Sequence, residues 1–495
     1  MIAVKTHPMA MSKQNKYKKE GIHVKKLIKN GYVLSMDPAI GEQKNCDVLI
    51  EDDHIVSVGP NLSAEGCEVI DASNCIVMPG FVDAHRHTWQ TQLRAVAADW
   101  TLFDYLVLMR MAYSAFYTEE DAYLGNYVGT LESLNAGVTT VVDHCHLINS
   151  PKYADRLIDG LIDSGTRAVF CYGFFINPKY NPFSLEQTPG WRYDDCKRVR
   201  KERLADDSAR VIFGVNPSEY DSTTEDVVKE ELKLCRDLGA NVISAHVAMG
   251  YYDARQYNVR KLARAGLIGP DMLFVHGSTL TQEELDAIKK AEAGIVSTPE
   301  VDLQMGMGHP IGLKYQKLGL RASLGLDIIS NYAAEMFTQM RVMLAEQRGQ
   351  ENDQVAMTTQ KIPGKLHTDV KDVVYLATMG GARAIHMEDR IGSLTPGKKA
   401  DIQLIRTDSI NMVPAAYTNP YAAVVHYANV SDVDTVIVDG KIVKQHGKLL
   451  GVDWSVLSEK MEKSIAHIAK SVNTVDHSKN ADFWHQIFGG MVSMD

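Results

Sequence analysis

The sequence predicts an α/β protein in which a (β/α)8 TIM barrel is joined to a small composite β-sandwich domain built from both chain ends. Three observations favour this fold. Strand-like apolar runs alternate with helical segments between residues 79 and 385. Alternating β-type runs precede this region at 22–78 and return after it at 386–450. The chain has 495 residues, enough for a barrel of about 250 residues and a second domain.

The two β-rich segments show period-two hydrophobic alternation interrupted by turn residues. The first contains KLIKNGYVLSM and DVLIEDDHIVSVG, and the second contains KKADIQLIRTD and DVDTVIVDGKIVKQHGKLL. Alternation of this kind is typical of strands with one buried face. Because the two segments lie far apart in the chain, we expect one domain whose strands come from both ends.

Residues typical of helix starts and helix ends recur in the central region, as expected for a repeated strand–helix unit. Thr281 followed by Glu284 predicts a capping box, and Ser150 before Pro151 predicts another helix start. Helix ends are expected at Gly137, Gly165, Gly239 and Gly294. A doubly wound open sheet is the alternative, but no glycine-rich phosphate-binding motif follows the first strand. The eight barrel strands are expected at 77–84, 138–143, 167–174, 210–215, 241–246, 272–276, 294–298 and 321–327.

The two ends of the chain lie outside this pattern. Residues 1–21 are rich in lysine and lack the continuous apolar segment of a signal peptide, so we expect a flexible basic extension. Residues 451–495 contain VLSEKMEKSIAHIAKSV, whose spacing predicts a helix that packs on the barrel exterior.

Composition and charge exclude several classes of partner. The chain is 45% hydrophobic and 23% charged, with a net charge of -10, and this mild acidity argues against nucleic acid. No apolar run reaches the roughly 18 residues of a membrane helix, so we expect no membrane partner. The seven cysteines are scattered and include no CxxC motif, which indicates reduced thiols and a cytoplasmic location.

Four histidines and one aspartate stand at the ends of predicted barrel strands. His85 and His87 end the first strand, where residues two apart point to the same side. His246 and His276 end the fifth and sixth strands, and Asp327 ends the eighth. The carboxyl ends of barrel strands meet at one mouth. Because imidazole and carboxylate groups are metal ligands, and a buried carboxylate needs a partner, these residues predict a metal centre.

Three separated stretches support this interpretation. They are VMPGFVDAHRH, GVTTVVDH (137–144) and GARAIHMEDRIGSLTPGKKADIQLI (381–405). In sequence and order they resemble signatures of the amidohydrolase superfamily, in the branch that holds cytosine and guanine deaminases, atrazine chlorohydrolase and triazine hydrolases. The resemblance covers about residues 25–450 and implies a barrel with a divalent zinc or iron ion at its mouth.

The resemblance also implies a role for each residue at the strand ends. His85, His87, His246 and Asp327 would bind one divalent transition metal, with Zn²⁺ expected before Fe²⁺, and His276 would hold the water or the substrate. The metal would supply hydroxide, Asp327 would accept a proton as general base, and His276 would donate to the atom that gains charge. This chemistry predicts hydrolysis of a C–N bond, by deamination or by amide or ring hydrolysis, in a small nitrogen heterocycle or amide.

One position departs from the family pattern. The branch usually has a proton-donating glutamate three residues after the fifth-strand histidine, and Met249 stands there. His144, His146, Glu300 and His309 are the replacements considered, and His144 is preferred because its strand ends at the barrel mouth. His144, Glu300 and His309 are also candidate substrate contacts. The departure keeps three alternatives open: decarboxylation or other non-hydrolytic chemistry, hydrolytic dehalogenation, and a catalytically inactive scaffold.

The fourth predicted strand favours a single metal ion. Binuclear relatives bridge two ions through a lysine or glutamate at the end of this strand. Here the strand ends near Asn216, and Glu219 lies three residues beyond.

Loops that follow the strands are expected to line the substrate pocket. Trp89 and Gln92 follow His87 closely and suit a flat, polar heterocycle. Trp100 and Tyr105 are explained equally well by packing of the next helix. The stretch PEVDLQMGMGHP is rich in methionine and glycine and is expected to form an adaptable wall. The resemblance further implies a homo-oligomer that acts on a small molecule.

Overall fold

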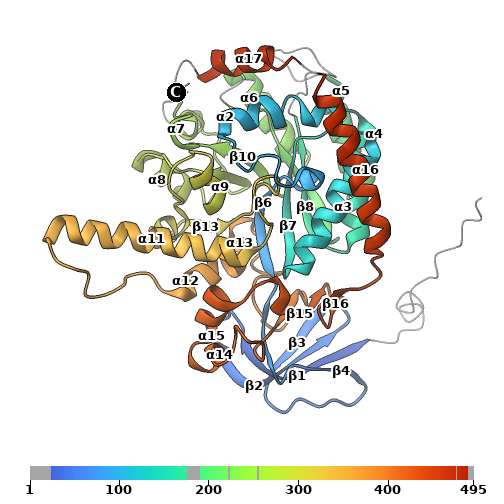
Figure 1. The fold of residues 1–495 in the computed structure, drawn as a ribbon, viewed down its shortest axis with the longest axis vertical. Helices are drawn as coiled ribbons and strands as arrows, with labels where there is room; N and C mark the ends of the chain where they lie inside the picture. The colour runs from blue at the N-terminus through green and yellow to red at the C-terminus, as the bar shows by residue number, and fades with distance from the viewer. Residues whose placement is uncertain (1–23, 175–189, 221–222, 253–255, 475, 489–495) are drawn as a thin grey trace, which may run out of the picture.

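A barrel and a separate β-sheet domain make up the computed structural model, which describes residues 24–174, 190–220, 223–252, 256–474 and 476–488. In Figure 1 the barrel lies above and the β-sheet domain below. The predicted extension at residues 1–21 lies outside the described residues.

Eight parallel strands form the barrel and pair with one another in chain order. Nearly every side chain in them is buried, which is typical of parallel strands that are covered on both faces. The predicted (β/α)8 barrel is therefore present. The strands are β6 (Phe81–Arg86), β7 (Val138–Cys145), β8 (Arg167–Gly173), β9 (Val211–Asn216), β10 (Ile243–Val247), β11 (Met272–His276), β12 (Gly294–Ser297) and β13 (Arg321–Leu324).

The barrel closes between β6 and the segment that follows β13. The amides of Leu326 and Asp327 donate to the carbonyl oxygen of His85 at 3.1 and 2.9 Å, and the His87 amide donates to the Asp327 carbonyl at 2.8 Å. The buried carboxylate of Asp83 accepts the Leu326 amide at 2.9 Å. These bonds hold Asp327 against the strand that carries both histidines.

Helices surround the barrel and connect its strands (Figure 1). Thr281 and Glu284 form the predicted capping box at the start of α8, and Pro151 is the first residue of α4. Among the described residues, no helix combines the length and apolar character that crossing a membrane requires. The main helices are α3 (Glu119–Asn135), α4 (Pro151–Ser164), α5 (Gly190–Arg198), α6 (Glu225–Asp237), α7 (Asn258–Arg264), α8 (Gln282–Lys290), α9 (Pro299–Gln304), α10 (Gly312–Lys317), α11 (Met336–Thr359), α12 (Val370–Tyr375), α16 (Trp454–Val472) and α17 (Ser478–Phe488).

Short helical turns complete the connections. Those near the barrel mouth are η1 (Thr88–Leu93), α2 (Leu102–Asp104), η2 (Tyr105–Met109), η3 (Tyr113–Phe116) and η5 (Gly250–Tyr252). Elsewhere the chain forms η4 (Val199–Arg203), η6 (Leu376–Gly380), α13 (Gly381–Ala384), α14 (Ala415–Thr418), α15 (Pro420–Ala422), η7 (Ala423–Tyr427) and η8 (Val430–Asp432).

One expected helix end is wrong. Gly137, Gly165 and Gly239 have positive φ, as helix-terminating glycines do, but Gly294 is the first residue of β12. The left-handed residue after α8 is Glu292, with φ 55°. A Cβ atom on Gly294 would lie 2.1 Å from the carbonyl oxygen of Ala384, so this glycine serves the close approach of α13 to the strand.

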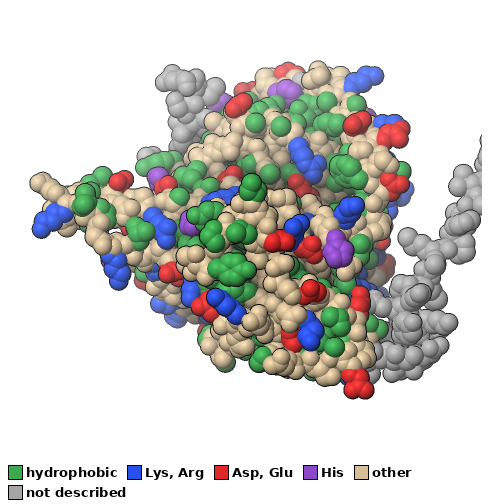
Figure 2. Space-filling model, turned by 60° about the horizontal axis from the view of Figure 1, so that its bottom comes forward, with side chains coloured by type: hydrophobic (Ala, Val, Ile, Leu, Met, Phe, Trp, Pro, Cys, Tyr) green, Lys and Arg blue, Asp and Glu red, His purple; other side chains and the backbone are tan. Residues whose placement is uncertain are grey.

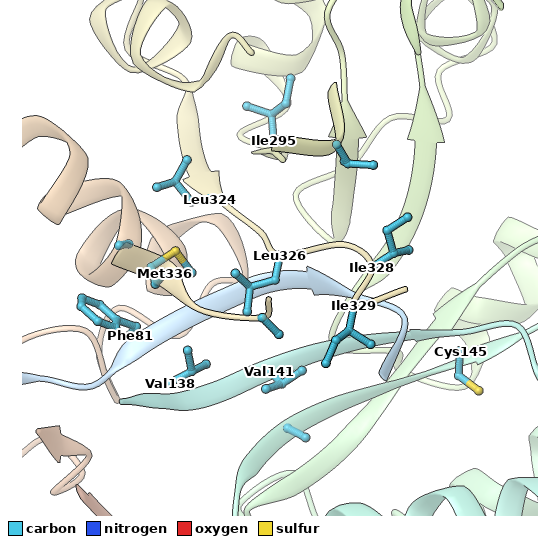
Figure 3. Packing of buried hydrophobic residues seen from close by; sticks show 14 of the residues in the cluster. Phe81, Val138, Val141, Cys145, Ile295, Leu324, Leu326, Ile328, Ile329 and Met336 are labelled. Carbon is cyan, nitrogen blue, oxygen red and sulfur yellow. The ribbon is translucent and has the colours of Figure 1, made fainter. Parts of the chain in front are cut away.

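Apolar side chains pack beside the point of barrel closure. Phe81, Leu324, Leu326 and Met336 lie between β6, the end of β13 and the start of α11 (Figure 3). The rings of Phe81 and Phe337 meet edge to face at 5.3 Å. This packing fixes the relative position of the first and last strands.

Strands from both ends of the chain form one continuous nine-stranded sheet in the second domain. The order is β17-β16-β15-β14-β5-β1-β2-β3, and β4 pairs with β1. The N-terminal strand β5 pairs antiparallel with β14, placing Val77 opposite Leu404. The strands are β1 (Lys25–Leu34), β2 (Glu42–Glu51), β3 (His54–Gly59), β4 (Cys67–Asp71), β5 (Cys75–Pro79), β14 (Ile402–Arg406), β15 (Val433–Val438), β16 (Lys441–Gln445) and β17 (Lys448–Leu449).

A buried ion pair connects the two domains. Arg167 in barrel strand β8 contacts Asp401 at 2.6 and 3.1 Å and Asp439 at 2.9 Å. Arg167 and Asp401 are both buried. The guanidinium group thus joins the barrel to the carboxylates that flank β14 and β15.

The C-terminal helices extend along and across the barrel. Helix α16 packs on the barrel exterior against α3, where Met461 joins Leu124 and Val128 in a small apolar cluster. Helix α17 crosses the end of the barrel that lies away from the β-sheet domain (Figure 1).

Helix α11 projects from the body of the molecule (Figures 1 and 2). Its buried side chains lie between Met336 and Leu344, and Met357 near its other end is 78% exposed. Figure 2 also shows positive and negative side chains interspersed over this face of the molecule.

Candidate metal centre

A cavity opens at the carboxyl ends of the barrel strands. The space between its lining side chains, including its opening to solvent, is about 510 Å³. Its polar lining comes from the residue after β6, from η2 and the residue after it, from the loop after β9, from β10 and β11, and from the segment after β13. These polar residues are His87, Tyr105, Arg110, Glu219, His246, His276 and Asp327.

Four imidazoles and one carboxylate lie close together at the base of the cavity. The Oδ1 atom of Asp327 lies 3.4 Å from Nε2 of His85 and 3.3 Å from Nε2 of His87. The Nε2 atom of His246 lies 3.3 Å from that of His85. The possible ligand atoms of His85, His87 and Asp327 all lie within 4.8 Å of one another, as do those of His85, His246 and His276. Residues from distant strands therefore form two groups of possible ligands that overlap at His85.

Hydrogen bonds at the opposite ring nitrogens orient three of these imidazoles. Nδ1 of His87 lies 2.7 Å from the His144 carbonyl oxygen, which accepts only, so this nitrogen carries the proton. Nδ1 of His246 lies 3.1 Å from Glu219. Nδ1 of His276 lies 3.0 Å from Asp302. For His87 and His246, the partner at Nδ1 leaves the Nε2 lone pair for the centre, as in metal sites whose histidines bind carboxylates or carbonyls.

Burial favours the neutral form of the histidines. It lowers the pKa of His85 to about 4 and the pKa of His87 well below its ordinary value. Burial alone would raise the pKa of Asp327, but the hydrogen bond with His85 and the surrounding imidazoles hold the pKa of this carboxyl well below its usual range. Neutral imidazoles beside an ionised carboxylate form a donor set that suits a divalent cation.

Two residues of the site have unusual backbone geometry. His276 has φ 71° and Asp327 has φ 57°, in the left-handed region that side chains other than glycine rarely adopt. Such strain persists where surrounding structure imposes it, and it clusters at functional sites. At Asp327, the hydrogen bonds to β6 impose it.

Comparison with known proteins agrees with this geometry. The model of the Amidohydrolase family matches residues 76–443. The chain belongs to the amidohydrolase family. A 5-methylthioadenosine/S-adenosylhomocysteine deaminase of Desulforudis audaxviator is 26% identical over 458 residues, covering 90% of this chain and 99% of the relative. The predicted family is confirmed, and with it the class of hydrolases acting on carbon–nitrogen bonds.

Solved structures share the fold of this amidohydrolase. An adenosine deaminase from Xanthomonas campestris with bound zinc has a TM-score of 0.77 at 22% identity, covering 90% of this chain and 98% of that one. An atrazine chlorohydrolase from Arthrobacter aurescens TC1 complexed with zinc has a TM-score of 0.77 at 20% identity, covering 89% and 99%. The barrel and its attached β-sheet domain are therefore a known architecture.

Arg110 and Asp302 in the amidohydrolase site were not predicted from the sequence, and Glu219 was considered there only as a ligand bridging two ions. Glu219 and Arg110 form an ion pair at 3.3 Å inside the cavity. Burial alone would raise the pKa of Glu219, but His246 and Arg110 lower it to about 2. Arg110 could have been predicted as a site residue, because it is the one charged residue in the apolar run YLVLMRMAY and a buried charge needs a partner. Asp302, behind His276, gave no comparable signal.

Tyr105 lines the cavity, but Trp89 and Gln92, the two residues preferred as pocket lining after the first strand, do not. Trp89 and Gln92 are buried behind the cavity wall, because the chain turns inward in η1 and packs against α3. Trp89 donates to Nδ1 of His146 at 3.2 Å, and Gln92 donates to the Asp121 carbonyl at 2.7 Å. The prediction that they line the pocket is wrong. Both residues support the wall from behind.

The three other candidate contacts are not among the residues that line the cavity, although His144 packs directly against the histidine cluster. His144 is buried with its ring 4.3 Å from that of His246, and its Nδ1 lies 2.9 Å from Ser244. Glu300 is half-buried and accepts from Gln339 at 2.6 Å. The side chain of His309 is 68% exposed and pairs with Glu346. Both residues follow barrel strands in the sequence, but Glu300 contacts the buried Gln339 of α11 and His309 lies at the surface.

The methionine-rich stretch does form part of the wall, as expected. Met305 and Met307 line the cavity beside Met249. Leu102, Leu106 and Trp484 complete this apolar side.

Proposed function

We propose that this amidohydrolase removes an amino group from a small nitrogen heterocycle by hydrolysis, releasing ammonia. The close grouping of His85, His87, His246 and Asp327 at the base of the cavity, through separations of 3.3–3.4 Å that each involve His85 or Asp327, carries the proposal. The 26% identity to a deaminase over nearly the whole chain supports this reaction among those of the family.

We infer that these four residues hold one divalent transition metal, with Zn²⁺ expected and Fe²⁺ the alternative. Three imidazole nitrogens and one carboxylate oxygen are ligands that zinc accepts. Two proteins of the same fold were solved with zinc, which supports this choice of metal. When bound, the ion supplies acidity that makes a water molecule nucleophilic near neutral pH.

Asp327 and His276 are the residues that we assign to proton movement. The Asp327 carboxylate lines the cavity and is positioned to accept a proton at an oxygen. The Asp302 carboxylate at Nδ1 of His276 stabilises a protonated ring, so Nε2 is able to donate a proton or hydrogen bond into the cavity. Loss of an amino group requires such a donation, because ammonia leaves more readily than an amide anion.

Met249 favours a second candidate reaction. It lines the cavity at the position where the resemblance expects a glutamate, and methionine transfers no proton. A halide leaving group departs without a proton, so hydrolytic dehalogenation fits this wall as well. Decarboxylation is the third reaction to be tested.

The test combines metal analysis with a substrate panel. The wild-type enzyme is expected to contain about one metal ion per chain and to release ammonia from amino-substituted pyrimidines, purines or triazines. Assays of chloride and carbon dioxide with halogenated and carboxylated rings distinguish the alternatives. His85→Ala, His246→Ala and Asp327→Ala should lose both metal and turnover. The control is His309→Ala, because His309 lies at the surface. A metal content equal in all variants would overturn the proposal.

We also propose that the enzyme acts in the cytoplasm as a homo-oligomer on a small-molecule substrate. Its cysteines are free throughout the described residues, which supports a reducing compartment. Light scattering of the purified chain tests the assembly.

A further inference from the structure

The C-terminal helix α17 contributes a wall to the cavity of the proposed metal centre. Trp484 lines the same cavity as His87, His246 and Asp327, although it lies more than 150 residues beyond Asp327 in the chain. Its side chain is only 2% exposed. Figure 1 shows α17 lying across the end of the barrel where the strands have their carboxyl ends. We call α17 in this position the roof of the cavity.

The roof is fastened to the segment that follows the first barrel strand. Nε1 of Trp484 donates to the Leu106 carbonyl at 3.1 Å, and Nδ2 of Asn480 donates to the Val107 carbonyl at 3.3 Å. The rings of Phe103 and His485 lie 4.6 Å apart. A backbone carbonyl satisfies the indole N–H group, and the indole forms part of the apolar lining of the cavity.

The side chains around Trp484 indicate which kind of substrate ring fits beneath the roof. Met249, Met305 and Met307 present thioether groups, and Leu102 and Leu106 present aliphatic groups. The charged groups of the lining belong to the histidine cluster, Asp327 and the Arg110–Glu219 pair. Thioether and indole groups make favourable contacts with flat π systems. An uncharged ring therefore suits this wall, with its reacting substituent directed to the metal centre.

We propose that Trp484 is a specificity-determining residue, which selects planar, uncharged nitrogen heterocycles by contact between its indole and the substrate ring. This inference rests on the proposed function, because the metal centre supplies the reaction. It adds the requirement that the ring, and not only the scissile bond, is recognised.

The first test compares variants at position 484 on ring and non-ring substrates. Trp484→Ala should raise KM for aminopyrimidines, aminopurines or aminotriazines about tenfold or more, since ring stacking is lost. KM for a small acyclic amide should change much less. Trp484→Phe keeps an aromatic ring and should retain most of the preference. Asp482→Ala is the matched control on the exposed side of α17 and should behave as wild type.

The second test measures binding without turnover. The probe is the parent heterocycle that lacks the amino group, and its affinity is measured by calorimetry with metal content checked in each variant. Trp484→Leu keeps apolar packing on η2 but lacks a flat ring. If the alanine variant does not fold, the leucine variant still shows whether the ring is needed for binding. Both variants should bind the probe about tenfold more weakly than wild type. Trp484→Phe should bind it nearly as well as wild type.

The two proposals fail in different ways. If Trp484→Ala and Trp484→Leu keep wild-type KM values and wild-type affinity for the probe, the role of Trp484 is overturned. If no protein, wild type included, releases ammonia from any ring, the proposed deamination fails. The binding measurement still decides whether Trp484 recognises a ring in that case.

Discussion

The carboxylate of Glu219 lies 3.1 Å from Nδ1 of His246. The other nitrogen of the same ring, Nε2, lies 3.3 Å from Nε2 of His85. Because the pKa of Glu219 is lowered to about 2, the carboxylate stays ionised near neutral pH and accepts the Nδ1 proton. The loop after β9 therefore decides which nitrogen of His246 faces the proposed metal.

Replacing Glu219 should weaken metal binding without removing a ligand. In Glu219→Gln the amide no longer stabilises the Nδ1–H form of His246 by charge, and we expect a 10- to 100-fold lower affinity for Zn²⁺. Competition with a chromophoric chelator measures it. Glu346→Gln is the matched control, because Glu346 pairs with the exposed His309. Equal affinities of wild type and Glu219→Gln would contradict this role.

Asp302 should act through His276. Asp302→Asn removes the charge that stabilises a protonated His276, and we expect kcat to fall about 100-fold while metal content stays unchanged. Steady-state kinetics and elemental analysis together check this. The control is Asp286→Asn on the exposed side of α8, where nothing should change. Loss of metal from Asp302→Asn would mean that Asp302 supports the site as a whole.

The ion pair of Arg167 with Asp401 should stabilise the packing of the barrel against the β-sheet domain. Arg167→Met leaves a buried carboxylate without its cation, and the expected loss of unfolding free energy is about 3–5 kcal/mol. Denaturation by urea, followed by circular dichroism, measures the loss. Lys233→Met breaks an exposed pair with Asp237 and should cost less than about 0.5 kcal/mol. Similar losses in both variants would argue against the role of the buried pair.

Two glycines should respond in opposite ways to alanine. Gly294→Ala places a Cβ atom 2.1 Å from the Ala384 carbonyl oxygen, so strands or helix must shift, at a cost of about 1–3 kcal/mol. Gly349→Ala meets nothing within 4 Å in helix α11 and should stabilise by about 0.5–1 kcal/mol. Thermal unfolding of both variants checks the contrast. A neutral Gly294→Ala would show that the close approach is easily relaxed.

Glu300 should make stability depend on pH. Burial, together with the charge of Glu335, raises the pKa of Glu300 to about 7 from its ordinary 4.5. Between these values the folded chain holds a proton that the unfolded chain releases, so this group lowers stability as pH rises. Glu300→Gln should therefore be more stable than wild type by about 1 kcal/mol at pH 8, after allowance for solvent screening. The difference should vanish near pH 4, and urea titrations at both pH values measure it.

Local patterns predicted much of this molecule because they depend on neighbours in the chain. His85, His87, His246, His276 and Asp327 could be placed at strand ends from apolar runs, and parallel strands bring such ends together. The turn into η1 was not predictable, and it moves Trp89 and Gln92 behind the wall. Gly294 was wrongly predicted as a helix end, because its close approach to Ala384 joins distant parts of the chain and the neighbouring sequence does not indicate it. Trp484 reaches the cavity only through docking of α17 on η2, which no spacing in the sequence indicates.

The pairing of β5 with β14 has a consequence for biosynthesis. Val77 cannot pair with Leu404 until the ribosome has added Leu404, about 330 residues later. At roughly 5–20 residues per second, the edge of β5 stays unpaired for on the order of 15–60 seconds. An open strand edge is a template for unwanted association. Newly made chains are therefore expected to need chaperone protection until translation passes the C-terminal strands.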